Sequence, residues 1–151
     1  MTERVSRRRL LAGLGTLGVG ALAGCSTATG QSTSRLAYVR VANWHTAAHT
    51  VHVLVERDGS LVHWSSHDLP GRDSEITTRP LDQTWVDEQS EFVVRVRIDD
   101  QNTWKVFDLA GREGDCYGVE ARVDEQGSVG VWYEQSPAQC RTSPQNAETE
   151  G

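Results

Sequence analysis

Apolar residues at every second position are the feature that most constrains the fold of this 151-residue chain. In residues 92–98, Phe-Val-Val-Arg-Val-Arg-Ile, the apolar side chains at positions 92, 94, 96 and 98 alternate with Val93, Arg95 and Arg97. Successive side chains of a β-strand point to opposite faces, so this pattern predicts a strand with one buried face. No stretch shows a sustained 3.6-residue period with caps, so we expect helices to be absent or limited to single turns.

Similar alternation recurs along the chain and predicts further short strands. They lie at about residues 38–41, 51–56, 61–64, 104–107, 117–123 and 129–133, with a weaker one at 75–78. About seven short strands separated by turns, in roughly a hundred residues, are typical of an all-β, antiparallel two-sheet sandwich. We therefore expect an immunoglobulin-like architecture.

All five histidines fall between residues 45 and 67. If Asp58-Gly59 forms a two-residue hairpin turn, residues whose numbers sum to 117 face each other. His52, His63 and His67 then share the outer face of the hairpin, with diagonal α-carbons about 7–8 Å apart. Three converging imidazoles can hold copper or zinc. The competing interpretation is an ordinary polar face turned to solvent, because the chain lacks the Cys-His-Met ligand set of blue-copper sandwiches.

Tryptophan is over-represented, with five copies against two phenylalanines. Trp64 and Trp104 fall in phase with inward valines, so we expect both in the core. Trp132 is out of phase with Val131 and shares its face with Gly130. An exposed tryptophan beside a glycine can stack on a sugar or a partner protein, and the alternative is that the C-terminal tail covers it.

The start of the chain carries an export pattern. Arg7 and Arg8 belong to a cationic stretch that precedes about fourteen uncharged residues, 10–23. That run is shorter than the roughly twenty apolar residues that a transmembrane helix needs, and its glycines make it a poor helix. A weakly hydrophobic run behind paired arginines resembles a twin-arginine export signal.

The tetrapeptide Leu22-Ala23-Gly24-Cys25 resembles a lipobox, in which small residues admit the signal peptidase and the cysteine thiol receives a lipid. Together with Arg7 and Arg8, this resemblance implies a twin-arginine-exported lipoprotein on the extracytoplasmic face of the cell membrane, anchored through a lipid on Cys25. The competing interpretation is a cytoplasmic protein with a tail rich in arginine, alanine and glycine.

The remaining sequence divides simply. We assign residues 1–24 to a signal peptide, 25–35 to a flexible small-polar tether, and 36–135 to the sandwich domain. We expect residues 136–151 to form a polar, mostly disordered tail that is anchored at Cys140.

Cysteine usage agrees with export. If Cys25 carries a lipid, Cys116 and Cys140 remain as an even pair in a compartment where disulfides persist, so we expect them to be joined. The alternatives are a free nucleophile or a metal thiolate, and neither has a CxxC motif or a nearby histidine in the sequence to support it.

The charge balance limits the partners. From Cys25 onward the chain has 11 Lys+Arg against 20 Asp+Glu, and Lys105 is its only lysine. Such an acidic, arginine-over-lysine composition is typical of proteins from extreme halophiles, where salt screens the charges. A genome of high GC content explains the arginine but not the acid excess. Nucleic acid is an unsuitable partner, because binding phosphate needs clustered positive charge.

Short motifs suggest relatives. Val41-Ala42-Asn43, His49-Thr50-Val51-His52-Val53 and the Asp58-Gly59 turn resemble segments of a group of secreted lipoproteins of halophilic archaea. The resemblance covers roughly residues 36–135 and implies no particular activity.

Catalytic motifs are missing from the sequence. There is no GxSxG elbow, HExxH motif, phosphate-binding glycine loop or Rossmann fingerprint, so we expect no enzyme. Two classes of function remain. The leading one is a membrane-anchored, non-catalytic sandwich that binds an envelope protein, another envelope component or a small ligand. The alternative is a histidine-rich lipoprotein that handles copper or zinc.

Overall fold

A computed structural model describes residues 32–73 and 75–141. The export residues Arg7, Arg8 and Cys25 lie outside this range. No helix in the described part of the chain is long and apolar enough to cross a membrane. The described elements are, in chain order, β1 (Arg35–Asn43), β2 (His49–Arg57), β3 (Ser60–Leu69), β4 (Thr77–Pro80), β5 (Phe92–Ile98), β6 (Lys105–Asp108), β7 (Cys116–Val123), β8 (Val129–Gln135) and the 3₁₀ helix η1 (Ala138–Arg141).

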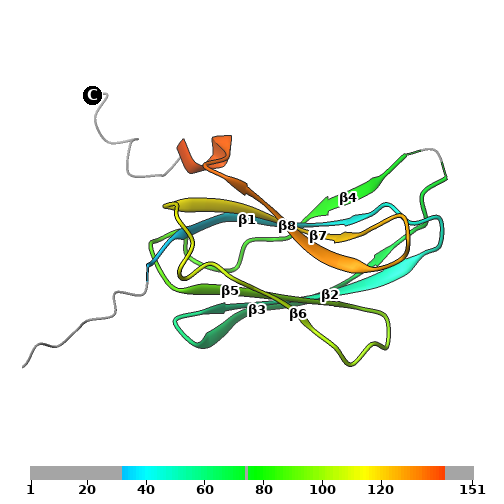
Figure 1. Cartoon of the computed structure of the whole chain (residues 1–151), viewed down its shortest axis with the longest axis horizontal. Helices are drawn as coiled ribbons and strands as arrows, with labels where there is room; N and C mark the ends of the chain where they lie inside the picture. The colour runs from blue at the N-terminus through cyan, green and yellow to red at the C-terminus, as the bar shows by residue number, and fades with distance from the viewer. Residues whose placement is uncertain (1–31, 74, 142–151) are drawn as a thin grey trace, which may run out of the picture.

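The eight strands form two four-stranded sheets that pack face to face (Figure 1). The upper sheet in Figure 1 has the order β4-β1-β7-β8, and the lower sheet has the order β3-β2-β5-β6. Neighbouring strands are antiparallel except β1 and β7, which are parallel. The predicted all-β, two-sheet sandwich is therefore confirmed, with eight strands in place of about seven and one parallel pair. The strand order differs from the ABED and CFG sheets of immunoglobulin constant domains, so the likeness is one of architecture.

The alternation seen in the sequence builds the core. Phe92, Val94, Val96 and Ile98 of β5 are fully buried, while the residues between them are partly exposed. Inward valines of β1, β2 and β7 belong to the same apolar cluster. Each such side chain contributes about 1.5–3 kcal/mol on full burial, so this cluster holds the two sheets together.

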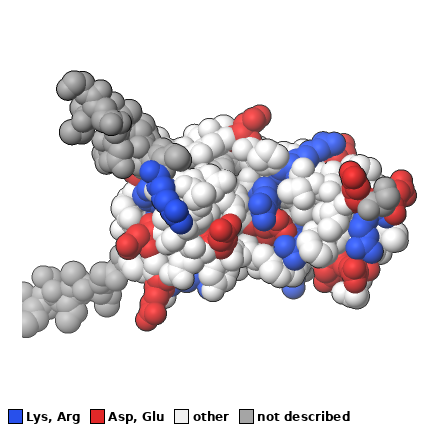
Figure 2. Space-filling model, turned by 90° about the horizontal axis from the view of Figure 1, so that it is seen from above, with Lys and Arg blue, Asp and Glu red and all other residues white. Residues whose placement is uncertain are grey.

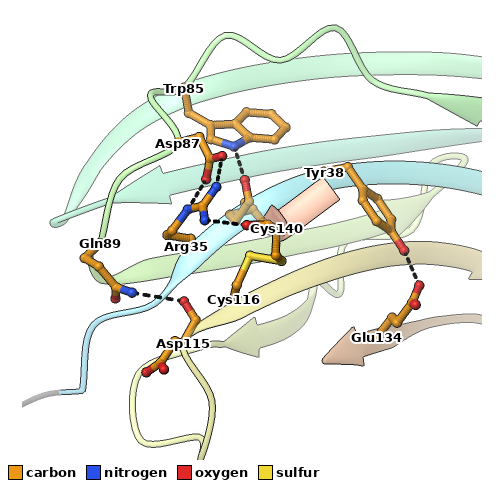
Figure 3. The surroundings of a disulfide bond; sticks show 10 residues. Arg35, Tyr38, Trp85, Asp87, Gln89, Asp115, Cys116, Glu134 and Cys140 are labelled. Carbon is orange, nitrogen blue, oxygen red and sulfur yellow. Dashed lines mark hydrogen bonds and ion pairs between the residues drawn. A yellow bond between two sulfur atoms is a disulfide. The ribbon is translucent and has the colours of Figure 1, made fainter. Parts of the chain in front are cut away.

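Among the tryptophans, Trp85 is the one that lies in the core. It follows β4, is 5% exposed, and donates a hydrogen bond from Nε1 to the carbonyl oxygen of Leu36 at 2.8 Å (Figure 3). The indole of Trp85 also contacts the ring of His63 edge to face, and the two ring centroids are 5.6 Å apart. The prediction of a buried Trp64 is wrong, because this side chain is 68% exposed. The prediction that Trp104 lies in the core is also wrong, because its side chain is only half-buried, with the guanidinium of Arg97 over its ring.

A β-bulge explains the error at Trp64. Asp58 and Gly59 both have positive φ and form the predicted two-residue turn, which pairs Glu56 with Leu61. The next pair joins Val55 with His63, so Val62 is an extra residue in β3. A shift of one residue turns every following side chain to the opposite face. The register in which facing residues sum to 117 is therefore wrong beyond the bulge.

The C-terminal part of the domain is fastened by a disulfide. Cys116 at the start of β7 is bonded to Cys140 in η1, as predicted (Figure 3). Arg35 adds a second tie, because its Nη1 donates to the carbonyl oxygen of Cys140 at 2.9 Å while the same guanidinium pairs with Asp87. The turn of 3₁₀ helix at the anchor is an ordered stretch that the polar composition of the tail did not predict.

Candidate ligand-binding face

The outer face of the upper sheet carries aromatic and charged side chains in cross-strand rows. The register places three residues in each of two neighbouring rows, one from each of β1, β7 and β8: Arg40, Glu120 and Trp132 in the first, and Tyr38, Gly118 and Glu134 in the second. We call this surface the Trp132 face and define it by Tyr38, Arg40, Trp44, Glu120, Arg122, Trp132 and Glu134.

Strand alternation determines which side chains reach this face. In β1, Val39 and Val41 point into the core, so Tyr38 and Arg40 point outward. In β7 the inward positions are again apolar. Its outward positions supply Glu120 and Arg122 to the face.

Glu120 binds two guanidinium groups. Its Oε2 accepts a hydrogen bond from Nε of Arg40, and its Oε1 accepts one from Nε of Arg122, each at 2.5 Å. The Glu120 side chain is only 8% exposed, whereas the Arg40 side chain is 43% exposed. Charge-assisted hydrogen bonds of this kind are short and directional. Arg40 is therefore held at its Nε, while its outer part can still reach a ligand.

Arg122 lies between two indole rings. Its guanidinium carbon is 4.1 Å from the ring centroid of Trp44 and 4.6 Å from that of Trp132. Such cation–π contacts fix the orientation of the rings and stabilise by about 0.5–2 kcal/mol. A Cβ atom at Gly130 would lie 2.7 Å from the Trp132 ring, so the indole occupies the space above this glycine.

Trp132 itself remains 40% exposed. The sequence-based expectation of an exposed indole beside a glycine is thus confirmed, whereas ligand binding by it stays a prediction. Among the described residues, Arg122 covers part of the ring, and residues 142–151 of the tail considered as an alternative lie outside the described range.

Tyr38 lies over Gly118, its partner in the register, where a Cβ atom would be 2.1 Å from the ring. Its hydroxyl donates to Oε2 of Glu134 at 3.0 Å (Figure 3). Burial and this hydrogen bond to a carboxylate raise the pKa of Tyr38 above its usual value. The phenol therefore stays protonated and holds Glu134 in place.

Two shallow hollows adjoin on this face. One, of about 200 Å³, is lined by most of the Trp132 face together with Gly118 and Tyr133. The other, of about 270 Å³, is lined by Tyr38, Arg40, Thr78, Pro80 and Gln139. Both are lined by Tyr38 and Arg40, so they lie next to each other, and we call the two together the depression, which extends from β8 to β4. At about 4.8 Å between neighbouring strands, this depression crosses roughly 14 Å of sheet.

The structure separates the three histidines that were predicted to converge. His52 is the register partner of Ser66, and its Nδ1 lies 2.7 Å from the Ser66 hydroxyl on the exposed side of the lower sheet. His63 and His67 lie on the other side of β3, because the bulge reverses their direction. The expectation that all three imidazoles share one face is therefore wrong. Within residues 32–73 and 75–141, no group of three or more His, Cys, Asp or Glu side chains is arranged to hold a metal.

His63 and His67 instead belong to a directed chain of hydrogen bonds. Thr84 donates its hydroxyl proton to the carbonyl of Val62, so it accepts from Nδ1 of His63 at 2.9 Å. Nε2 of His63 then accepts from the Ser65 hydroxyl at 2.7 Å, and Ser65 accepts from Nε2 of His67 at 2.8 Å. Burial lowers the pKa of both histidines below the usual value, so both rings are neutral at pH 7, and the chain itself requires this of His63, whose Nε2 is the acceptor.

A second histidine cluster, which the sequence analysis did not single out, lies beside a hollow of about 440 Å³. Nδ1 of His49 is 2.7 Å from Oδ2 of Asp99, and Nε2 of His49 is 2.8 Å from Nδ1 of His45. Burial acts to raise the pKa of Asp99, but the hydrogen bonds from His49 and from the Thr50 amide outweigh it and hold this pKa below its usual value. These contacts join the loop after β1 to the turn after β5, so the cluster ties two loops at one end of the sandwich.

The sequence pattern predicts one member of the Trp132 face, Trp132 itself, but not its partners. Arg40, Glu120 and Arg122 are out of phase with buried valines, and that phase is a signal for outward-facing residues. Their convergence depends on the parallel pairing of β1 with β7, which the strand pattern does not specify.

No family model and no curated protein matches this chain, so comparison with known proteins does not assign it to a family.

Proposed function

We propose that this protein is a non-catalytic lipoprotein, exported by the twin-arginine pathway and anchored through Cys25, that binds an envelope component through the Trp132 face. The location rests on the sequence, in which Arg7-Arg8 precede a short apolar run that ends in a lipobox. The small-polar stretch between Cys25 and β1, which begins at Arg35, is long enough to hold the sandwich off the membrane surface.

One observation carries the binding role: Arg122 is held between Trp44 and Trp132, beside a depression that a half-exposed indole borders. Tryptophan and arginine are the residue types most enriched at binding hot spots, because they offer large contact areas that are already ordered. Gly118 leaves room for the ring of Tyr38, and Gly130 leaves room for the ring of Trp132. The aromatic surface is therefore already formed before a ligand binds. Such preorganisation lowers the entropy cost of binding.

We expect Cys25→Ser to leave export intact and to release the protein from the membrane. Without the thiol there is no lipid, and a lipid chain gains about 0.8 kcal/mol for each CH₂ group it buries in the bilayer. The double variant Arg7→Lys/Arg8→Lys should block export instead. Fractionation of cells, with immunoblots of membrane, soluble extracytoplasmic and cytoplasmic fractions, checks both outcomes. Retention of the Cys25→Ser protein in membranes after salt and carbonate washes would exclude a lipid anchor on Cys25.

The released Cys25→Ser protein should rebind to isolated envelopes from cells that lack the protein, and adding Trp132→Ala should weaken this binding at least tenfold. Loss of the indole removes both the exposed ring and one side of the Arg122 stack. The matched control is Trp64→Ala, which removes a more exposed tryptophan from the lower sheet. Co-sedimentation over a range of protein concentrations gives the affinities. Equal binding by both variants would contradict a role for the Trp132 face.

A further inference from the structure

We infer that the ligand of the Trp132 face is an electrically neutral saccharide chain. This inference rests on the proposed function, because it names the ligand class for the same face. Three properties of the face carry it: its charge balance, its hydrogen-bonding groups, and the shape and aromatic lining of the depression.

The charges of the face cancel. Arg40 and Arg122 contribute two positive groups, and Glu120 and Glu134 contribute two negative ones. Figure 2, which looks down on the upper sheet, shows basic and acidic side chains interspersed rather than gathered into a patch of one sign. A polyanion is attracted by a surplus of positive charge, and a cation by a surplus of carboxylates. A balanced face has neither surplus and favours a neutral partner.

The hydrogen-bonding groups suit hydroxyls. Arg40 presents guanidinium N–H donors, since Glu120 engages its Nε and the side chain remains partly exposed. Glu134 is exposed and presents carboxylate acceptors, held in place by Tyr38. A sugar hydroxyl donates one hydrogen bond and accepts others, so it can pair with both kinds of group. Hydrogen bonds to charged partners are about twice as strong as neutral ones, which offsets the loss of water from the hydroxyls.

The aromatic lining suits the other side of a sugar ring. The face of an indole is electron-rich and attracts polarised C–H groups, such as those on the apolar side of a pyranose. Trp132 borders one hollow, and Tyr38 stands where the two hollows meet. The depression is shallow, elongated and open, and it crosses four strands. This shape fits a chain of linked sugars better than a single small molecule.

The test uses the released, full-length Cys25→Ser protein and isolated envelopes treated in three ways. Periodate, followed by borohydride, cleaves vicinal diols of sugars. Carbodiimide followed by borohydride converts sugar carboxylates to alcohols and leaves neutral sugars unchanged. Protease digestion removes protein partners. Mock-treated envelopes are the reference, and the Trp132→Ala and Trp64→Ala versions of the released protein are measured on each preparation.

We expect periodate to reduce the Trp132-dependent binding at least tenfold, and carboxyl reduction and protease to change it less than twofold. Binding should also persist in molar salt, where charge attraction is screened. Undiminished binding after periodate would overturn a saccharide ligand, and loss after protease alone would assign a protein partner. Loss after carboxyl reduction would overturn neutrality and indicate an acidic saccharide. Each of these leaves the proposed binding role standing. That role fails if intact envelopes show no binding that depends on Trp132.

Discussion

Replacing Trp85 with alanine should lower the free energy of unfolding by about 3–5 kcal/mol, the usual cost of deleting a large buried aromatic side chain. The indole is 5% exposed and packs against the core and the ring of His63. Its loss also leaves the carbonyl oxygen of Leu36 without the 2.8 Å hydrogen bond from Nε1. Denaturant unfolding in high salt, followed by circular dichroism, measures this change as a lower midpoint.

The matched control is Trp64→Ala, which removes a side chain that is 68% exposed. Substitutions at such positions usually change stability by no more than about 0.5 kcal/mol. The comparison tests the bulge at Val62 directly, because only the shifted register turns Trp64 toward solvent. If Trp64→Ala is the costlier of the two, the hairpin has the register without a bulge, and Trp64 lies in the core.

This hairpin also shows how far the sequence could predict the fold. Where a strand has a continuous apolar face, as β5 does, the alternation gives both the strand and its buried side, and the structure agrees. In β3 the stretch His63-Trp64-Ser65-Ser66-His67 holds a single large apolar residue. The sequence of such a segment does not indicate which of its faces is buried. One extra residue near the turn therefore shifts the register, and the alternation pattern does not reveal the shift.

The candidate site was predictable in part for a similar reason. Alternation in β8 placed Trp132 outward beside Gly130, since Val129 and Val131 set the phase. The same argument puts Arg40 and Glu120 on outward faces but cannot bring them together. They are 80 residues apart, and their contact depends on β1 lying between β4 and β7. The order of strands that are far apart in the sequence depends on how the two sheets pack around the whole core, so a local pattern cannot predict it.

The cysteine pair, by contrast, was predictable because the argument needed only an even count and an oxidising compartment. The structure adds what the bond fastens. Cys116 begins β7, which lies between β1 and β8 in the upper sheet, and Cys140 lies in η1, whose backbone accepts a hydrogen bond from Arg35. The bond therefore holds the end of the described chain against the same sheet that carries the Trp132 face.

Breaking this disulfide should lower the free energy of unfolding by about 3.5 kcal/mol, the chain-entropy value for its separation of 24 residues. Reduction of the wild-type protein and the variant Cys116→Ala/Cys140→Ala should give similar losses, and a reductant should have no further effect on the variant. If the stabilisation is entropic, the free energy of unfolding should also fall more steeply with denaturant concentration once the bond is broken. The reason is that an uncrosslinked unfolded chain exposes more surface. A loss of stability without that steeper slope would place the effect in the folded state, where the bond and Arg35 together hold η1. No change in midpoint on reduction would mean that the bond contributes nothing to the stability of the sandwich.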